Sequence, residues 1–263
     1  MTESTLPSPF GSVIYFLLIT LCFAGGIIFL IKKTLNKENA ASAADSTMYN
    51  IIYVSLIVFG IYFINVTISK AMCSGPINWG HIFIVTLLPW LIIFFSLYFV
   101  LTIFPGWANP FSNTIGYGVI GIFGVDKIYN NIFKTGSEAS GNPELVKAIA
   151  NMNSNKTKFV NQISTNLIDF DDFFKNIKDA LKDTEITSEN NKKYLLELYQ
   201  LLIIKQFVGK IVWYILAGIL ISSISYNLII SMNCQKTEEQ MKKEIETNIN
   251  ALETNKQTQL QGL

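Results

Sequence analysis

Residues 82–104 read Ile82-Phe-Ile-Val-Thr-Leu-Leu-Pro-Trp-Leu-Ile-Ile-Phe-Phe-Ser-Leu-Tyr-Phe-Val-Leu-Thr-Ile-Phe104, 23 positions without a charged side chain. A helix needs about 20 apolar residues to cross roughly 30 Å of hydrocarbon, so this stretch is long enough to span a membrane. Each Leu, Ile, Val or Phe contributes roughly −0.3 to −0.6 kcal/mol to insertion, and the sum strongly favours the bilayer. Three more uncharged stretches of similar length lie at 10–31, 50–69 and 211–232.

The composition of the whole chain agrees with membrane insertion. Half of the 263 residues are hydrophobic and only 15% are charged, which is too apolar for an ordinary soluble domain. The first stretch is followed by Lys32 and Lys33 rather than by a small-residue cleavage site, so we expect a retained anchor and not a signal peptide. We therefore predict an all-α membrane protein with about four transmembrane helices, the membrane region extending over 10–125 with three of them.

Lysine residues set the expected orientation, because basic residues accumulate on the cytoplasmic side of a membrane. The tail 1–9 carries none, whereas Lys32, Lys33 and Lys37 follow the first span. This balance places both ends of the chain on the lumenal or exterior side. The segments expected in the cytoplasm are 32–49 and 105–210.

The region 126–210 is polar enough to form a small helical extramembrane module. Within it, apolar residues recur three or four positions apart, a spacing that places them on one face of a helix. We expect this stripe to be buried, either in the module or against a partner protein. Its members are Phe170, Phe173, Phe174, Ile177 and Leu181.

A second apolar stripe starts near residue 188 and runs directly into the fourth stretch. This continuity predicts one helix over 188–232 that joins the module to the membrane, with Gly209 as a point where it could bend. The residues that follow, 233–263, are polar and predict a partly helical tail.

The segment Thr114-Ile115-Gly116-Tyr117-Gly118 spells a potassium-filter sequence, in which backbone carbonyl oxygens replace the hydration shell of an ion. A filter needs a pore helix before it and a complete inner helix after it. Pro105, Gly106 and Pro110 oppose a preceding helix. The apolar run 115–125 would extend roughly 16 Å as a helix, about half the hydrocarbon thickness. A potassium-channel-like pore is therefore an alternative and not the preferred function.

The same segment contains four glycines and several aromatic residues. Gly116, Gly118, Gly121 and Gly124 would provide a small-residue surface that lets another backbone approach closely. Trp and Tyr are enriched at the boundary between lipid headgroups and hydrocarbon. We therefore predict that 105–125 is a Gly-rich interfacial or re-entrant element folded against the bundle.

Residues that could carry catalysis or transport are scarce. His81 is the only histidine, so neither a histidine-based zinc site nor a Ser-His-Asp triad can be assembled. The four apolar stretches contain no Lys, Asp, Glu or Arg, which usually mark transport pathways. We predict no catalytic, cofactor-binding or metal-binding residue. A net charge of +1 without a dense basic patch argues against nucleic-acid binding.

Polar residues inside the stretches are expected to form hydrogen bonds between helices. These residues are Asn65, Thr67, Ser222, Ser223 and Ser225.

The three cysteines fall into two groups. Cys22 lies inside the first stretch, where we expect a small buried apolar residue. Cys73 and Cys234 each lie just past the end of a stretch, on the predicted lumenal side. A disulfide between them is possible in that compartment, and two separate free thiols are the alternative.

The block from Phe104 to Tyr117 follows a hydrophobic hairpin and precedes a Lys- and Asn-rich helical region. This block resembles one found in membrane-embedded minor capsid proteins of large nucleocytoplasmic DNA viruses, the algal and giant-virus group. The resemblance covers 14 residues closely and the layout of the spans loosely. The residues that carry it are Pro105, Gly106, Trp107, Pro110, Phe111, Ser112, Asn113, Gly116 and Tyr117.

The resemblance implies a non-enzymatic structural protein in the inner membrane of a virion, derived from host endomembranes. Such a protein would link the bilayer to the icosahedral capsid lattice during assembly. Its expected partners are the lipid bilayer and other capsid or membrane proteins, and self-association stays open. Besides the channel, a cellular multi-pass membrane scaffold is the alternative.

Overall fold

In the computed structural model, every regular element among the described residues is a helix, and one isolated antiparallel bridge joins Phe133 and Leu181. The predicted all-α membrane fold is therefore confirmed. The tail 1–9 and most of the tail 233–263 lie outside the described residues, so the predicted partly helical tail is not addressed. The described residues are 10–73, 76–135, 138, 143–232, 234, 239, 241–243 and 245–247.

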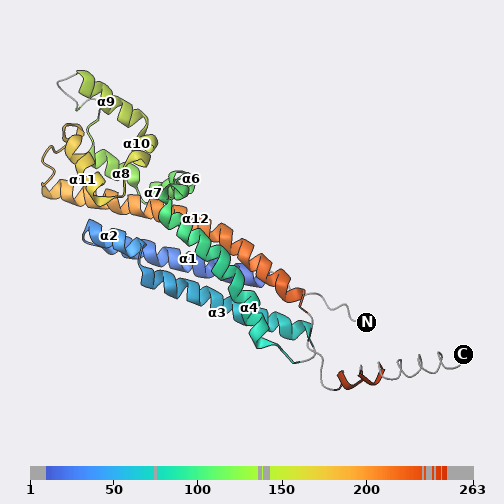
Figure 1. Cartoon of the computed structure of the whole chain (residues 1–263). Helices are drawn as coiled ribbons and strands as arrows, with labels where there is room; N and C mark the ends of the chain where they lie inside the picture. Colours follow the sequence, from blue (N-terminus) through green and yellow to red (C-terminus); the bar gives the residue numbers. More distant parts are fainter. Residues whose placement is uncertain are drawn as a thin grey trace, which may run out of the picture.

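Among the described residues, four helices are long and apolar enough to cross a membrane, as predicted. They lie side by side in an elongated bundle (Figure 1). The first span packs along both the second and the fourth. The spans are α1 (Phe10–Lys33), α3 (Thr47–Met72), the continuous run α4–η1–α5 (Trp79–Ile103) and α12 (Glu189–Ile230).

The third span is not a uniform α-helix. It consists of α4 (Trp79–Pro89), a π-helical turn η1 (Trp90–Phe94) and α5 (Phe95–Ile103). Pro89 has no backbone N–H and its ring clashes with the preceding turn, so a local widening directly after it is physically expected. We did not predict this interruption, although Pro89 was its signal in the sequence.

The fourth span extends far beyond the membrane. α12 is a single helix of 42 residues, as the continuous apolar stripe predicted. At about 1.5 Å per residue it is roughly 63 Å long, about twice the hydrocarbon thickness. Its C-terminal part, 211–230, contains the uncharged stretch predicted to cross the membrane, and its N-terminal half forms the axis of the extramembrane module.

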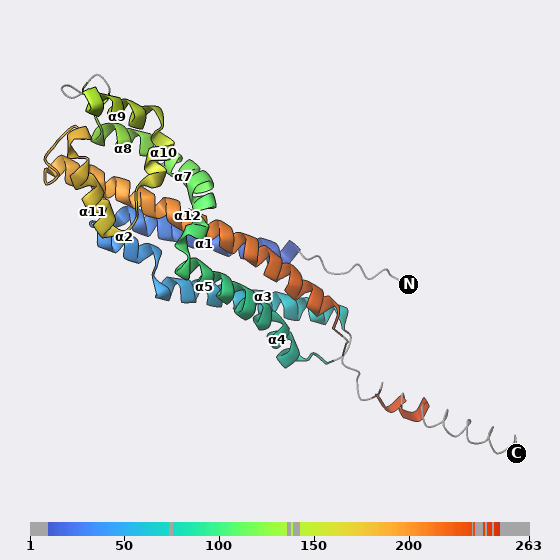
Figure 2. The same ribbon diagram turned by 45° about the horizontal axis from the view of Figure 1, so that its top comes forward.

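The extramembrane module gathers short helices around the N-terminal half of α12, at one end of the bundle (Figure 2). Apolar side chains from α8, α9, α10 and α11 share one hydrophobic core with the spans. The module helices are α8 (Val125–Ile132), α9 (Pro143–Ser154), α10 (Lys156–Gln162), α11 (Leu167–Asn176) and η4 (Lys178–Ala180).

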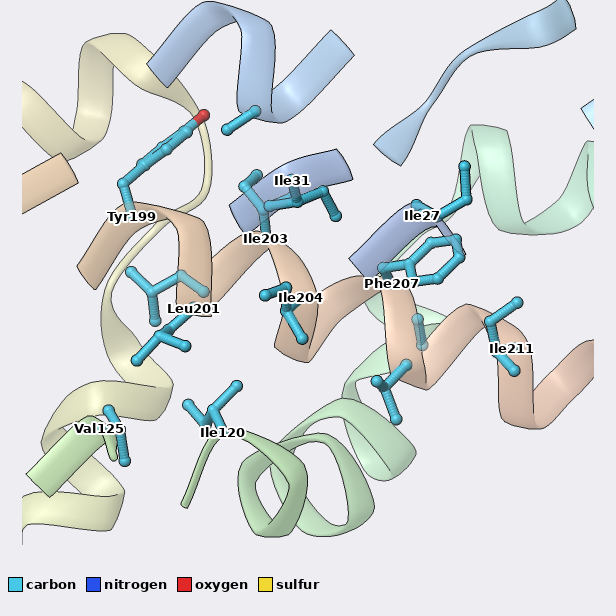
Figure 3. Packing of buried hydrophobic residues seen from close by; sticks show 14 of the residues in the cluster. Ile27, Ile31, Ile120, Val125, Tyr199, Leu201, Ile203, Ile204, Phe207 and Ile211 are labelled. Carbon is cyan, nitrogen blue, oxygen red and sulfur yellow. The ribbon is translucent and has the colours of Figure 1, made fainter. Parts of the chain in front are cut away.

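The end of the first span also belongs to this core. Figure 3 shows Ile27 beside Phe207 and Ile31 beside Ile203, so α1 continues into the module instead of ending at its edge. All four side chains are buried. The hydrophobic core therefore continues from the predicted membrane region into the module.

The segment 32–49 is not a simple loop. It contains α2 (Lys37–Ala44), which begins at the N-cap Asn36 and packs against α1 and α12. Lys37 forms an ion pair with Asp171 of α11, and the Lys210 Nζ lies 2.5 Å from an Asp45 oxygen. The segment 32–49 and the module therefore touch, which is compatible with the common side that the lysine distribution predicts.

The apolar stripe of the module is buried inside the chain. Phe170, Phe174 and Leu181 are fully buried, and Phe173 and Ile177 are half-buried against the same core. The stripe is not one helix face, because α11 ends at Asn176 and Leu181 follows η4. Phe170 meets Tyr199 of α12, and Phe174 meets Phe133, which directly follows α8. The stripe is therefore buried within this chain and does not need a partner protein to cover it.

Polar residues inside the spans behave in two ways. The Asn65 side-chain amide donates to Thr86 and Ser225 at 2.8 Å each, which ties α3, α4 and α12 together. Thr67 and Ser223 instead donate to carbonyl oxygens four residues earlier in their own helices, and the buried Ser222 hydroxyl has no hydrogen-bond partner. Our prediction that these three residues bridge helices is therefore wrong.

Two of the three cysteines are bonded to each other, and the third is free and exposed. Cys73 and Cys234 form a disulfide, with Cα atoms 5.4 Å apart, at the end of the bundle away from the module. Cys22 is exposed on the surface of α1. The prediction that Cys22 is buried inside the protein is therefore wrong. A small apolar residue is equally suited to a position on the span surface that faces lipid.

Candidate functional site

The segment that carries the family resemblance folds as a string of short helical turns, which we call the docked segment. Pro105 and Pro110 each occupy the first turn of one of these helices, where a missing N–H costs nothing. Our expectation that they would exclude helices is therefore wrong. The elements are η2 (Pro105–Ala108), α6 (Asn109–Phe111), η3 (Ser112–Gly116) and α7 (Tyr117–Ile122).

The potassium-filter sequence does not adopt a filter conformation. Residues 112–116 form a π-helical turn and 117–122 an α-helix. The Tyr117 N–H donates to the carbonyl oxygens of Ser112 and Thr114, so these oxygens are used within the helix. A filter requires extended backbone whose carbonyls face an ion. This geometry removes the physical basis for the channel alternative.

The docked segment lies on α12 with two glycines at the contact. A Cβ atom placed on Gly116 would be 2.4 Å from the Lys205 carbonyl oxygen, and one on Gly209 would be 2.8 Å from the Ala108 carbonyl oxygen. Both distances are far below van der Waals contact. The docked segment and α12 therefore each have a glycine at the point where the other backbone comes close. Gly209 allows this contact, and α12 continues through it as one helix.

The other glycines of the segment have different roles from those we predicted. A Cβ on Gly118 or Gly121 would meet no atom within 4 Å, so neither belongs to a close helix contact. Gly124 has a φ of 87°, in the left-handed region, where it turns the chain from α7 into α8. Only Gly116 of the four predicted glycines supports close packing.

Aromatic residues hold the membrane-proximal end of the docked segment. The Trp213 indole Nε1 donates to the Trp107 carbonyl oxygen at 2.9 Å. The Phe111 ring meets the Trp213 ring edge-on, with centroids 5.2 Å apart. Trp213 lies on the membrane-crossing part of α12. The contact therefore joins the first turns of the docked segment to the start of the span.

A buried lysine holds the other end. Lys205 is only 4% exposed, and its Nζ donates to the side-chain oxygens of Asn113 at 3.1 Å and Asn161 at 3.0 Å. The Asn161 amide in turn donates to the Asn113 carbonyl oxygen at 3.3 Å. One ammonium group thus connects α12, the docked segment and α10 of the module.

Burial lowers the pKa of this lysine. Lys205 lies before the membrane-crossing part of α12, and desolvation lowers its pKa from 10.5 to about 8. Its two partners are neutral amides, which accept hydrogen bonds but supply no compensating negative charge. A buried lysine without a carboxylate partner is costly to keep charged, which makes this contact sensitive to alkaline pH.

The docked segment exposes several large apolar side chains. Trp107, Ile115 and Ile122 are exposed, as is Phe123 directly after the segment. The Lys32 ammonium lies 5.0 Å from the centre of the Phe123 ring, at the end of α1. Exposed aromatic and aliphatic side chains beside a lysine are typical of the lipid headgroup region. This surface supports the predicted interfacial placement.

The structure brings most residues of the resemblance to one contact. Trp107, Phe111, Ser112, Asn113 and Gly116 all meet α12 or its side chains, and Ser112 is buried against Gly209. Pro105 and Pro110 shape the turns. The nearest side chain to Gly106 is that of Asn109, at ordinary contact distance. Tyr117 lies beside Asn113 and Asn161 at a polar cleft of about 820 Å³.

Sequence reasoning missed the partners of these residues. Lys205 was visible as a single lysine inside the apolar run 201–208, a pattern that indicates either an exposed edge or a special contact. Asn161 and Trp213 had no distinguishing signal. Each is separated from its partner by 48 or more positions, so only folding brings them together.

A search of protein-family models, of curated proteins and of solved structures returns no match for this chain. Among the described residues, no three His, Cys, Asp or Glu side chains are grouped so that they could hold a metal ion.

Proposed function

We propose that the protein is a non-enzymatic structural anchor that links a bilayer to a protein lattice, and that this bilayer is the inner membrane of a virion. The resemblance of the block 104–117 supports the viral assignment. The observation that carries the structural role is α12, one helix that belongs both to the module core and to the membrane bundle.

The geometry suits transmission of force. The module packs on the N-terminal half of α12, and the docked segment braces the helix at the point where it leaves the membrane. Lys205 on one side of this brace and Trp213 on the other connect it to the helix by hydrogen bonds. A pull on the module therefore acts on the span directly, without a loop that could extend first.

The partner would bind the outside of the module, because its apolar stripe is already used internally. The surface there is polar and mixed in charge, as in the exposed pair Lys175 and Asp172. Such a surface fits another capsid or membrane protein through hydrogen bonds and shape, and does not fit nucleic acid, which demands a basic patch.

The test follows the protein through particle assembly. After mild removal of the outer shell from purified particles, the protein should remain with the membrane-bearing core. Trp107→Ala and Asn113→Ala should impair assembly while leaving membrane insertion intact, because neither residue supplies insertion energy. Gly118→Ala is the matched control, since its position in the same segment is open.

Two results would contradict the proposal. The first is absence of the protein from purified particles, and the second is normal assembly in its absence. Stable membrane residence with cellular partners and no particle association would instead favour the cellular scaffold.

A further inference from the structure

We propose that the groove between the second and third spans holds one acyl chain of a membrane phospholipid. The groove has a volume of about 390 Å³ and is walled by α3 on one side and by the run α4–η1–α5 on the other. Tyr214 of α12 lies at its floor. This inference depends on membrane embedding alone and does not require the viral assignment.

Two features of the spans account for the groove. A hydrogen bond joins the second and third spans at one end, and a π-helical turn interrupts the α-helix of the third span further along. The Asn65 amide bonded to Thr86 joins α3 to α4 in the half nearer the disulfide. Beyond that point Pro89 and the π-helical turn interrupt the third span, and Trp90 and Phe94 of this turn line the groove. A π-helical turn inside an α-helix is frequent at binding sites.

The lining changes character with depth. Thr47 and Asn50, in the first turns of α3, and Tyr98 of α5 supply polar groups at the end nearer the module. Towards the middle of the bundle the walls become apolar, with Val58 and Leu87. A polar mouth at the membrane surface that leads into an apolar channel matches a phospholipid, whose headgroup stays at the surface while its chain enters the hydrocarbon.

The shape of the groove suits an extended chain. From Thr47 to Val58 an α-helix advances roughly 16 Å, so the groove follows the spans for about half the hydrocarbon thickness. Ile51, Leu91 and Phe95 line it and are exposed, so the groove opens sideways to the surrounding lipid. A hydrocarbon chain can therefore enter it from the bilayer and lie along its length.

Photo-crosslinking with a phospholipid tests the proposal. The full chain is reconstituted into phosphatidylcholine vesicles that contain a small fraction of phosphatidylcholine with a diazirine in the middle of one acyl chain. Adducts are then located by mass spectrometry. Two neighbouring pairs of residues provide the comparison: Val58 with Phe59, and Leu87 with Leu88.

Lipid that merely surrounds the protein should label the more exposed member of each pair, Phe59 at 60% or Leu88 at 51% exposed. A chain held in the groove should instead label Val58 and Leu87 several-fold more strongly, and excess unlabelled phospholipid should compete for these adducts. Preferential labelling of Phe59 and Leu88, or labelling that does not saturate, would overturn the proposal.

Variants that fill the groove test whether an acyl chain occupies it, and a control variant shows whether the substitution itself disturbs the fold. Val58→Trp fills the groove and should reduce adducts on Leu87 several-fold, and Val54→Phe should act in the same direction. Leu56→Trp on the exposed face of the same helix is the control and should change nothing. An intact Cys73–Cys234 disulfide in each variant verifies the fold. Unchanged Leu87 labelling in both groove variants would also refute the proposal.

Discussion

Gly116 lies directly on the backbone of Lys205, so close that a Cβ atom at position 116 would stand 2.4 Å from the Lys205 carbonyl oxygen. The same lysine sends its side chain to Asn113, three residues earlier in the docked segment. Backbone contact and side-chain hydrogen bond therefore act at one place. The docked segment can hold Lys205 only because residue 116 has no side chain.

Gly116→Ala should weaken or displace the docked segment, because the added methyl group meets a backbone atom that cannot move aside. We expect a loss of about 1–3 kcal/mol in the free energy of unfolding, typical of overpacking. Gly209→Ala should have a similar effect, since its Cβ would lie 2.8 Å from the Ala108 carbonyl oxygen. Thermal unfolding of the purified protein in detergent measures both.

Gly118→Ala and Gly121→Ala are the matched controls. Both positions lie on α7, and an added Cβ atom would meet no other atom within 4 Å. Alanine should therefore leave the free energy of unfolding unchanged or raise it by up to about 1 kcal/mol through its higher helix propensity. Equal destabilisation by all four substitutions would contradict the contact described here.

Lys205 should make stability rise with pH in the alkaline range. Its pKa is about 8 in the folded protein against 10.5 for an ordinary lysine, so between these values the unfolded chain binds more protons than the folded one. The free energy of unfolding should increase from pH 8 to 10.5, by at most about 3 kcal/mol. Below pH 8 this contribution should no longer change.

Lys205→Met tests the assignment, because methionine fills similar space without titrating. The variant should lose the rise between pH 8 and 9.5 in denaturation experiments, while Lys193→Met, an exposed lysine on the same helix, should keep it. Retention of the full rise in Lys205→Met would show that another group causes it.

The Cys73–Cys234 disulfide closes a loop of 161 positions and should stabilise the bundle. Cys73→Ser should lower the free energy of unfolding by about 2–5 kcal/mol, the usual range for a native disulfide. Peptide mapping without reduction, after free thiols have been blocked, should recover the two cysteines in one linked fragment. Cys22→Ser should leave both stability and the linked fragment unchanged, since Cys22 is free. Recovery of Cys73 and Cys234 only as blocked thiols would contradict the pairing.

Single cysteines at Ser42 and Asp179 should react from the same side of sealed vesicles, because α2 touches α11 through Lys37 and Asp171. A cysteine in place of Leu260 should react from the opposite side, since one span separates it from the module. Labelling with a membrane-impermeant maleimide, before and after permeabilisation, distinguishes the sides. Reaction of positions 179 and 260 from the same side would rule out the four-span topology.

The sequence by itself determined the spans and the long helix. Insertion energy is a sum over neighbouring residues, so 82–104 identifies a span without any knowledge of its partners. The same holds for α12, whose apolar stripe continues from the module into the membrane. The number of candidate spans followed from these local sums.

Only the tertiary structure decided what the docked segment does. Its sequence was compatible with an ion filter, a small-residue surface or an interfacial element. Which of these structures forms depends on the backbone segment that packs against it. The opposing backbone is that of Lys205 and Gly209, about ninety positions further along the chain. A pairwise contact of this kind has no local periodicity or composition. The roles of Gly116 and Lys205 therefore become visible only once the two helices are packed together.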